Sequence, residues 1–298
     1  MSVLVTGSTS QIGRFLLPRL VRAGEQVDAL SRRPQPVQPG VRWIEGGMAA
    51  LPPPVAGQWS AIASFSPLEA WVAWLSQQSV APAAKIIATS SMSVLTKQAS
   101  AQADEQDVVA MLQRGEQGLI AQAQRLGMQW VLLRPTLIYG AGIDRSLSPI
   151  VARARRLRVF PLPVAGGQRQ PVHADDIALA VLRAVQSPAA DGQVLEIGGG
   201  ERLRYDQMFA RVHASLVPRP MGVVVPGLAL RVLSSLVPRA RGPVSRLEQD
   251  LVADNGPLQS LLGVQPRPFR PENATWQPMT PEQAQQRIQA ASGPVPAA

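Results

Sequence analysis

Glycine residues near the N-terminus stand where a strand would turn into a helix. The sequence Val3-Leu-Val-Thr-Gly-Ser-Thr-Ser-Gln-Ile-Gly13 places Gly7 and Gly13 on either side of a short polar turn. Glycine lets the backbone approach phosphate oxygens closely, and the first turn of the following helix offers unpaired N–H groups and a partial positive charge. The turn therefore predicts a diphosphate-binding loop, with a purely structural turn as the alternative.

The elements that must position this loop alternate along the chain. The expected strands cover residues 2–5, 26–31, 41–45, 60–65, 85–90, 129–134 and 193–197, and the expected helices cover residues 12–23, 68–78, 105–126 and 174–186. Strands that alternate with amphipathic helices form a parallel sheet with helices on both faces. The predicted fold class is therefore α/β, with a doubly wound parallel sheet.

Several short motifs follow one another in a recognisable order. They are Thr6-Gly7 with Ile12-Gly13, Thr89-Ser-Ser-Met-Ser-Val94, Leu133-Arg-Pro-Thr-Leu-Ile-Tyr-Gly140, Gln170-Pro-Val-His-Ala-Asp-Asp-Ile-Ala178 and Val194-Leu-Glu-Ile-Gly-Gly-Gly200. In these motifs the chain resembles the extended short-chain dehydrogenase/reductases, in the NAD-dependent epimerase/dehydratase branch that includes nucleoside-diphosphate-sugar epimerases. The resemblance covers about residues 2 to 215.

The resemblance implies a Rossmann-type fold with a smaller C-terminal substrate-binding region. An NAD(P)-binding domain would occupy residues 1–140, completed by part of 171–200, and a smaller, mostly helical substrate or partner domain would occupy residues 141–298. The helices at 68–78 and 105–126 match the elements through which related proteins commonly form dimers. A homodimer is therefore expected by analogy.

The resemblance also implies roles for individual residues. Cofactor contacts are expected from Gly7, Thr9, Ser10, Gln11, Ile12, Gly13 and Pro135. Ser91 matches the catalytic serine, whose hydroxyl polarises the substrate oxygen, although a serine that only ends a strand is an equal alternative. Tyr139 would help shape the substrate cleft. Arg169 would hold a substrate phosphate, a task that suits a guanidinium group.

The end of the second expected strand bears on the choice of cofactor. A carboxylate there would hydrogen-bond a free ribose 2′-hydroxyl, but this chain has Ser31, Arg32 and Arg33. A hydroxyl and two guanidinium groups suit a dianionic 2′-phosphate, and one arginine could stack on adenine. These residues favour NADP, with NAD as the alternative. They could instead be surface residues of an arginine-rich chain.

The cofactor loop departs from the family pattern. Ser10 replaces the middle glycine and adds a side chain where the backbone should meet the pyrophosphate. Gly47 stands where an acidic residue often follows the third strand. Both changes predict weaker or shifted cofactor binding.

The catalytic pair of the family is absent. The family uses Tyr-x-x-x-Lys, in which the lysine lowers the pKa of the tyrosine, but neither Tyr139 nor Tyr205 has a lysine four residues later. In the expected helix that carries Glu116, the two positions hold Val108 and Leu112. The sequence therefore predicts an atypical member that keeps the cofactor fold and lacks the standard proton chemistry.

Histidine and cysteine offer no metal site. The chain has no cysteine and only two histidines, His173 and His213, so no bound metal is expected. His173 precedes Asp175 and Asp176 at the start of an expected helix, where acidic side chains complement the helix dipole. A structural role is therefore favoured for His173.

Composition restricts the class of protein. The 298 residues are 46% hydrophobic, which excludes global disorder. No apolar run reaches the roughly 18 residues of a membrane-spanning helix, and no leader pattern precedes the first strand, so a cytoplasmic protein is expected.

The net charge of +9 includes a cluster of arginines at 153–158, which we interpret as a solvated helix face. Because aromatic residues make up only 4% of the chain, nucleic-acid binding is not expected. Small anionic molecules remain suitable partners, because a positive field attracts them.

Two classes of function remain open. The first is an NADP-dependent oxidoreductase or epimerase/dehydratase-like enzyme for a small-molecule substrate such as a sugar nucleotide, in which Ser91 and a nonstandard acid, or water, replace the Tyr-Lys pair. The second is a protein that binds the dinucleotide without turnover, as a redox sensor or an assembly or regulatory factor. Loss of the catalytic pair favours the second class, whereas Ser91, Tyr139 and Arg169 favour the first.

Overall fold

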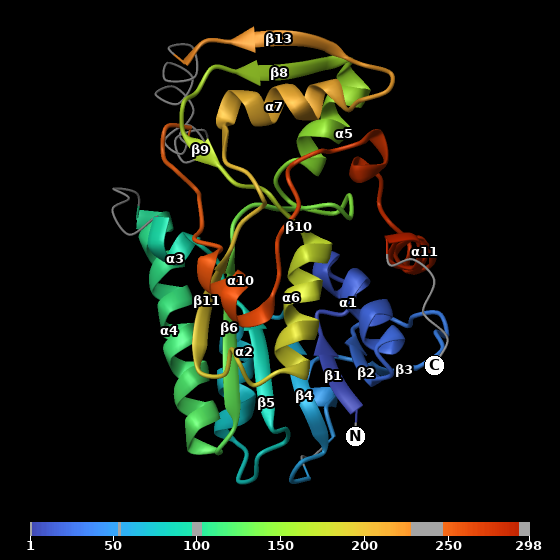
Figure 1. Cartoon of the computed structure of the whole chain (residues 1–298), viewed down its shortest axis with the longest axis vertical. Coiled ribbons are helices and arrows are strands. Elements are labelled where there is room, and N and C mark those ends of the chain that lie inside the picture. The colour runs from blue at the N-terminus through green and yellow to red at the C-terminus, as the bar shows by residue number, and fades with distance from the viewer. Residues whose placement is uncertain (1, 53–54, 97–102, 228–246, 292–298) are drawn as a thin grey trace.

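A parallel sheet of seven strands forms the centre of the protein. The computed structural model describes residues 2–52, 55–96, 103–227 and 247–291. The strands are β1 (Ser2–Thr6), β2 (Gln26–Ser31), β3 (Val41–Glu45), β4 (Trp59–Ser64), β5 (Lys85–Thr89), β6 (Gln129–Pro135) and β11 (Gln193–Ile197). They lie in the order β11-β6-β5-β4-β1-β2-β3, with helices on both faces (Figure 1). The predicted α/β class with a doubly wound parallel sheet is confirmed.

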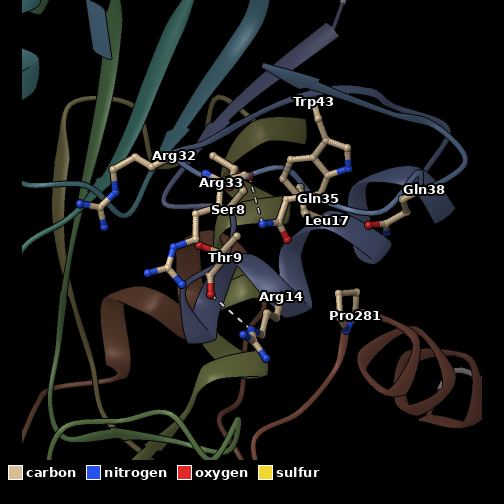
Figure 2. Close-up of a pocket in the computed structure, with 11 residues that line it drawn as sticks. Ser8, Thr9, Arg14, Leu17, Arg32, Arg33, Gln35, Gln38, Trp43 and Pro281 are labelled. Atoms are coloured by element: carbon tan, nitrogen blue, oxygen red, sulfur yellow. Dashed lines mark hydrogen bonds between the residues drawn. The ribbon is translucent and has the colours of Figure 1, made fainter. Parts of the chain in front are cut away.

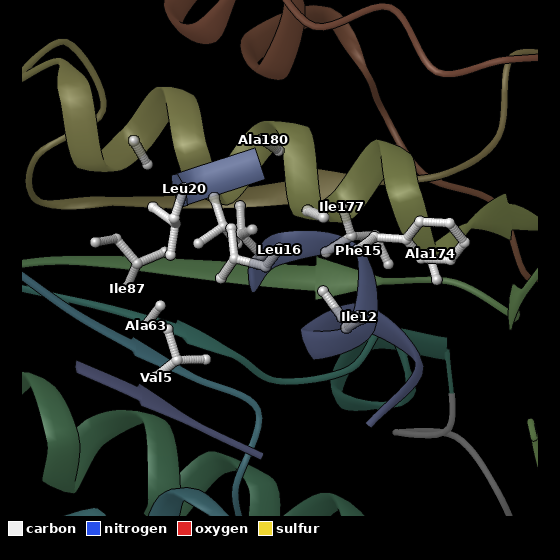
Figure 3. Packing of buried hydrophobic residues seen from close by; sticks show 14 of the residues in the cluster. Val5, Ile12, Phe15, Leu16, Leu20, Ala63, Ile87, Ala174, Ile177 and Ala180 are labelled. Carbon is white, nitrogen blue, oxygen red and sulfur yellow. The ribbon is translucent and has the colours of Figure 1, made fainter. Parts of the chain in front are cut away.

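Alternating side chains give the sheet its two buried faces. The main covering helices are α1 (Gln11–Arg22), α2 (Leu68–Ser76), α4 (Ala103–Arg125) and α6 (Ala174–Gln186). Val3 and Val5 of β1 pack in the cluster beneath α1 and α6, where Figure 3 shows Phe15 and Ile177. Leu4, between them, lies in the opposite cluster against α2 and α4. The period of two in β1 thus sends neighbouring side chains to different cores.

A second part of the chain lies beyond the carboxyl ends of the strands (Figure 1). It contains β7 (Ile138–Tyr139) paired with β10 (Val172–His173), β9 (Gln168–Arg169) with β12 (Leu203–Arg204), β8 (Val159–Pro163) with β13 (Met221–Val225), and helices α5 (Ser148–Leu157) and α7 (Tyr205–Ala214). The sequence predicts mostly helices here, whereas the structure adds these three small sheets. Their strands of two to five residues are too short to produce a recognisable alternation.

The remaining C-terminal helices lie against the central sheet layer. Helix α10 (Gly256–Leu262) contacts β11 and α6, and α11 (Pro281–Ala291) packs along α1. Ala284 and Ile288 of α11 belong to the same cluster as α1. The far end of the chain therefore covers the helix that follows the glycine loop.

A cluster of opposite charges joins three elements at the start of α6. Asp175 receives a hydrogen bond from Nε of Arg19 on α1 at 2.6 Å, and it pairs with Arg267 at 2.7 Å. Arg267 also binds Asp176 through its guanidinium and through its backbone N–H, the latter at 2.9 Å. Burial raises the pKa of Asp176 despite the charge of Arg267. At Asp175 burial acts in the same direction, but Arg19 and Arg267 together lower the pKa.

A second buried carboxylate ties the first four strands together near their amino ends. Asp28 on β2 receives hydrogen bonds from Ser2 and from Nε1 of Trp59, both at 2.8 Å, and two from Arg42 at 2.7 and 2.8 Å. Burial alone would raise the pKa of Asp28, but the donors Arg42, Trp59 and Ser2 outweigh it and lower the pKa. The carboxylate is therefore favoured in its ionised form.

The contacts of Asp28 predict that the free energy of unfolding decreases in acid. Because its folded-state pKa is lowered, its contribution is present above the unfolded pKa of about 3.9 and is lost as the pH falls through the folded value. Asp28→Asn should reduce the free energy of unfolding by about 2 kcal/mol at neutral pH and flatten its acid dependence. Urea unfolding from neutral to acidic pH measures both. The control Asp206→Asn removes an exposed pair with Arg204, which contributes at most about 1 kcal/mol, and equal losses in both variants would contradict the prediction.

Candidate functional site

The turn between β1 and α1 leaves no room for side chains at its two glycines. Gly7 has a φ of +69°, in the left-handed region, and a Cβ atom there would lie 2.9 Å from Cβ of Phe65. A Cβ atom on Gly13 would lie 2.4 Å from the carbonyl oxygen of Ser8. Glycine is therefore required at both positions, and the bare backbone of the turn can come close to a ligand.

Ser10 is the N-cap of α1. Its Oγ accepts a hydrogen bond from the N–H of Gly13 at 3.2 Å, and its own N–H donates to the carbonyl of Gly7 at 2.9 Å. The serine side chain thus occupies one of the N–H groups that a helix N-terminus offers to a phosphate. Next to it, Oε1 of Gln11 is buried without a hydrogen-bond partner among the described residues.

The loop opens onto a cleft of about 840 Å³ at the carboxyl ends of the strands. Its lining includes Thr9 and Gln11 after β1, Ser31 and Arg32 at the end of β2, Gly46 to Met48 after β3, Phe65 to Pro67 after β4 and Thr136 to Ile138 after β6. Ligands of open α/β sheets bind in this place. A Cβ atom on Gly47 would meet nothing within 4 Å, so the missing acidic side chain leaves open space.

A second cavity of about 550 Å³ adjoins the cleft and shares Thr9, Ser31 and Arg32 with it. Figure 2 shows that Arg14 of α1 and Arg33 from the loop after β2 also surround it. No Asp or Glu lies among the described residues that line this second cavity. Its charge is therefore positive, which suits an anionic group.

The arginines around this cavity differ in their surroundings. The Ser31 hydroxyl donates to the carbonyl of Arg33 at 2.7 Å, which forms a tight turn. Arg32 and Arg33 are exposed, and no carboxylate of the described chain pairs with either guanidinium. Arg14 instead donates to the carbonyl oxygens of Thr9, at 3.2 Å, and Met279, and burial lowers its pKa.

Two other predicted cofactor residues lie deeper. Ile12 is buried in the core beneath the loop. Pro135 is buried at the end of β6, and its carbonyl accepts a hydrogen bond from the N–H of Met92 at 3.0 Å. Both residues support the walls around the cleft, and neither belongs to its lining.

Serine hydroxyls and apolar side chains occupy the positions at which the resemblance places the catalytic groups. The Oγ of Ser91 accepts a hydrogen bond from the N–H of Ser93 at 3.1 Å, which leaves its own proton to be donated elsewhere. The Oγ of Ser90 is buried without a partner in the described chain. On α4, Val108 is exposed and Leu112 is half-buried. None of these residues is in the lining of the cleft.

Tyr139 and His173 form a buried aromatic pair outside the cleft lining. Their ring centroids are 5.1 Å apart in an edge-to-face arrangement, and the ring centroids of Phe269 and Tyr139 are 4.8 Å apart. Burial raises the pKa of Tyr139, so it stays neutral. His173 is the N-cap of α6, because its Nδ1 accepts a hydrogen bond from the N–H of Asp175 at 3.1 Å, which agrees with the structural role expected from the sequence. Burial, aided by the charge of Arg267, lowers the pKa of His173 to about 3.

Arg169 is buried within the C-terminal part of the chain. It donates to the carbonyl oxygens of Gln168 at 2.8 Å and Gln249 at 2.5 Å, and its guanidinium lies 4.8 Å from the ring centre of Tyr205. These contacts hold the guanidinium in place and outside the lining of the cleft. Contact between Arg169 and a substrate phosphate stays a prediction, as does the role of Tyr139 in the substrate cleft.

Asp144 and Arg145 add to the site a feature that the motifs do not indicate. Oδ1 of Asp144 accepts from the N–H groups of Ser146, Leu147 and Ser148 at 2.9, 2.6 and 3.1 Å. These three hydrogen bonds fix the turn that leads into α5, and Arg145 in this turn is exposed at the edge of the cleft. The sequence signal is an aspartate just before an amphipathic helix. Arg14 was equally recognisable, because it directly follows the last glycine of the loop.

The described residues form neither a metal-binding cluster nor a membrane-spanning helix. No three acidic or histidine side chains gather there into a group that could hold a metal ion. No helix in those parts of the chain is both long and apolar enough to cross a membrane.

Comparisons with known proteins agree with the fold. Residues 112–198 match the model of the NAD dependent epimerase/dehydratase family. MoeE5 in complex with UDP-glucuronic acid and NAD is 19% identical, with a TM-score of 0.67 over 96% of this chain and 100% of that chain. The resemblance to the NAD-dependent epimerase/dehydratase family is thus confirmed over residues 112–198, and the structure shows the shared fold.

Other structures of epimerases share the same architecture. UDP-glucuronic acid 4-epimerase from Bacillus cereus in complex with NAD is 13% identical, with a TM-score of 0.68 over 97% of this chain and 100% of that chain. A putative epimerase from Burkholderia cenocepacia is 18% identical, with a TM-score of 0.67 over 96% and 98% of the two chains. No curated protein matches the sequence. At these identities the structures establish a shared fold.

Ser10 gives a test of how the glycine loop works. Ser10→Gly should tighten binding of the dinucleotide, because it removes a side chain from the loop and releases the N–H of Gly13. The free energy of unfolding should fall by only a few tenths of a kcal/mol, since glycine is tolerated at an N-cap. Calorimetric titration with NAD and NADP and thermal unfolding measure the two effects.

Ser10→Ala is the matched control, because it removes the cap and keeps a Cβ atom. Its free energy of unfolding should fall by about 1 kcal/mol. Weaker dinucleotide binding by Ser10→Gly than by the unmodified protein would show that the serine itself contacts the ligand, contrary to the prediction.

Proposed function

We propose that the protein binds a nicotinamide dinucleotide in the cleft and acts as an atypical oxidoreductase or epimerase/dehydratase-like enzyme on a sugar nucleotide or another carbonyl or alcohol substrate. The observation that carries the proposal is the continuity of the cleft from the glycine loop to the ends of β2, β4 and β6. The structural neighbours with NAD and UDP sugars support this choice of ligands.

The residues around the loop fit a dinucleotide. Gly7 and Gly13 expose backbone that a Cβ atom would obstruct, and the N-terminus of α1 favours a diphosphate. Open space at Gly47 leaves room beside the ends of β2 and β3. When bound, the nicotinamide would supply or accept the hydride. The protein would contribute orientation and exclusion of water.

Proton transfer needs an arrangement different from that of the family. The titratable side chains in the described lining of the cleft are Arg32, Asp144 and Arg145. Oδ1 of Asp144 already accepts three backbone N–H groups in the turn that leads into α5. We infer from the resemblance that the substrate oxygen lies beyond this lining, toward the end of β5, where the Ser91 hydroxyl donates a hydrogen bond to it and water takes up or supplies the proton. Arg145 at the edge of the cleft supports an anionic substrate such as a nucleoside diphosphate.

NADP is the cofactor that the chain's own residues favour. Arg32 and Arg33 are free of carboxylates within the described chain, and with Arg14 they surround a cavity beside the adenosine end of the cleft. A 2′-phosphate would find positive charge there, and no acidic side chain to repel it. NAD is the alternative, supported by its presence in the neighbours.

The cofactor proposal predicts a preference that two substitutions remove. The double variant Arg32→Ala, Arg33→Ala should weaken binding of NADP and NADPH by at least about tenfold, since hydrogen bonds to charged groups contribute about 1.5 to 3 kcal/mol each. Binding of NAD and NADH should change little. Calorimetric titration of all four cofactors measures this, with Arg114→Ala, Arg183→Ala as a charge-matched control. Tighter binding of NAD than of NADP by the unmodified protein would identify NAD as the cofactor.

A protein that binds the dinucleotide without turnover is the second candidate. The specific observation in its favour is the replacement of both catalytic side chains by Val108 and Leu112 on α4. Such a protein would act as a redox sensor or an assembly factor. A cytoplasmic location and a homodimer through α2 and α4 remain predictions, whether the protein is an enzyme or only binds the dinucleotide.

Ser91 separates the two candidates. In the enzyme, Ser91→Ala should lower kcat about a hundredfold, the usual effect of removing one donor to a developing oxyanion. Ser93→Ala, which keeps the N–H that binds Ser91, should retain most activity. Turnover of UDP-glucose and of simple carbonyl compounds with bound dinucleotide is the measurement. Tight dinucleotide binding with no turnover of any substrate would favour the second candidate.

A further inference from the structure

One end of the molecule combines exposed arginines with exposed aliphatic side chains. It is built by α5, β8, α7 and β13, and Figure 1 shows it at the end far from the N-terminus and beyond the central sheet. The function proposed above uses none of its residues. Its properties therefore call for a separate explanation, which does not depend on that function.

The exposed arginines at the carboxyl end of α5 form no ion pair with an acidic side chain of the described chain. The sequence contains no Asp or Glu from Arg145 to Ala174 or from Gln207 to Gly227. Arg153, Arg156 and Arg158 are exposed at and after the end of α5. None of their three guanidinium groups forms a hydrogen bond or an ion pair within the described chain. Their charge is therefore available to an anionic partner.

Aliphatic side chains stand among these arginines. Leu157 is 58% exposed, Met221 is 65% exposed and Val223 is 40% exposed. The N–H of Met221 donates to the carbonyl of Arg158 at 2.9 Å, and Met221 lies opposite Val159 in the register of β13 and β8. The carboxyl end of α5 and the start of β13 are thus joined directly, and we treat the exposed arginines of the one and the exposed aliphatic side chains of the other as one candidate surface. We name it the cationic–apolar face, consisting of Arg153, Arg156, Leu157, Arg158, Met221 and Val223.

Arg158 occupies an unusual backbone position. Its φ is +56°, in the left-handed region at the C-terminus of α5, where a glycine would be less strained. The strained residue thus carries a long, exposed cationic side chain at the point where its backbone binds the start of β13. A structural helix end alone would not require arginine here.

We propose that the cationic–apolar face docks on the surface of an anionic lipid bilayer. Arginines attract lipid phosphates, while aliphatic side chains enter the boundary between head groups and acyl chains, and peripheral membrane proteins combine the two effects. Unneutralised positive charge complements the anionic head groups. A nucleic-acid surface would need aromatic or hydrogen-bonding side chains to stack on or read bases, and the exposed apolar residues of this face are aliphatic.

Vesicle binding by the full-length protein tests the proposal. The protein should sediment with vesicles of phosphatidylcholine and phosphatidylglycerol, and not with phosphatidylcholine alone. Arg153→Gln, Arg156→Gln, Arg158→Gln should weaken this binding by about a hundredfold, at about fivefold for each arginine near the surface. Met221→Ser, Val223→Thr should weaken it further at high salt, where the charge contribution is screened.

A charge-matched variant separates a local face from the overall positive charge. Arg114→Gln, Arg183→Gln, Arg287→Gln changes three exposed arginines on α4, α6 and α11 and should bind the anionic vesicles like the unmodified protein. Equal loss in the two triple variants, with thermal unfolding unchanged, would overturn the proposal. Absence of binding to anionic vesicles, or tighter binding to a duplex oligonucleotide lost in the first triple variant, would also overturn it.

Discussion

The paired aspartates at the start of α6 hold together the parts of the protein that form its site. Asp175 is bound by Arg19 of α1, while Asp175 and Asp176 are both bound by Arg267 from the C-terminal segment. Removal of one partner would leave a buried charge without compensation, which costs far more than the pair itself contributes. The geometry of the glycine loop thus depends on α1, whose position is fixed by α6 and by residues near the end of the chain.

Much of the fold could be predicted from the sequence because the relevant signals are local. In the strands of the parallel sheet, apolar residues either alternate with polar ones or follow one another without interruption between turn residues. The predicted ends of these strands agree closely with those of β1 to β6 and β11. Gly7 and Gly13 were recognisable because a close backbone approach tolerates no side chain. The small sheets of the C-terminal part gave no such signal, since their pairing joins residues distant in the sequence.

The candidate site was less predictable, because its side chains are placed by distant contacts. The motif around Tyr139 indicated a substrate cleft, but the ring packs against His173 and Phe269. Arg169 likewise extends toward Gln249. No local pattern specifies either contact. In contrast, Arg145 lines the cleft because Asp144 binds the backbone of the same turn. That contact is local, but its relevance to the site can be recognised only once the cleft is known.

The pairing of β11 with β6 sets an order for the assembly of the chain on the ribosome. Strand β6 ends at Pro135, whereas its outer neighbour spans Gln193–Ile197, so residues 136–192 must be synthesised before the sheet gains its last strand. Until then, β6 presents an open edge of backbone donors and acceptors, a surface on which nascent chains associate wrongly. A pause in translation inside this interval would prolong that exposure. Synonymous codon choice there could therefore affect the yield of folded protein without changing any residue.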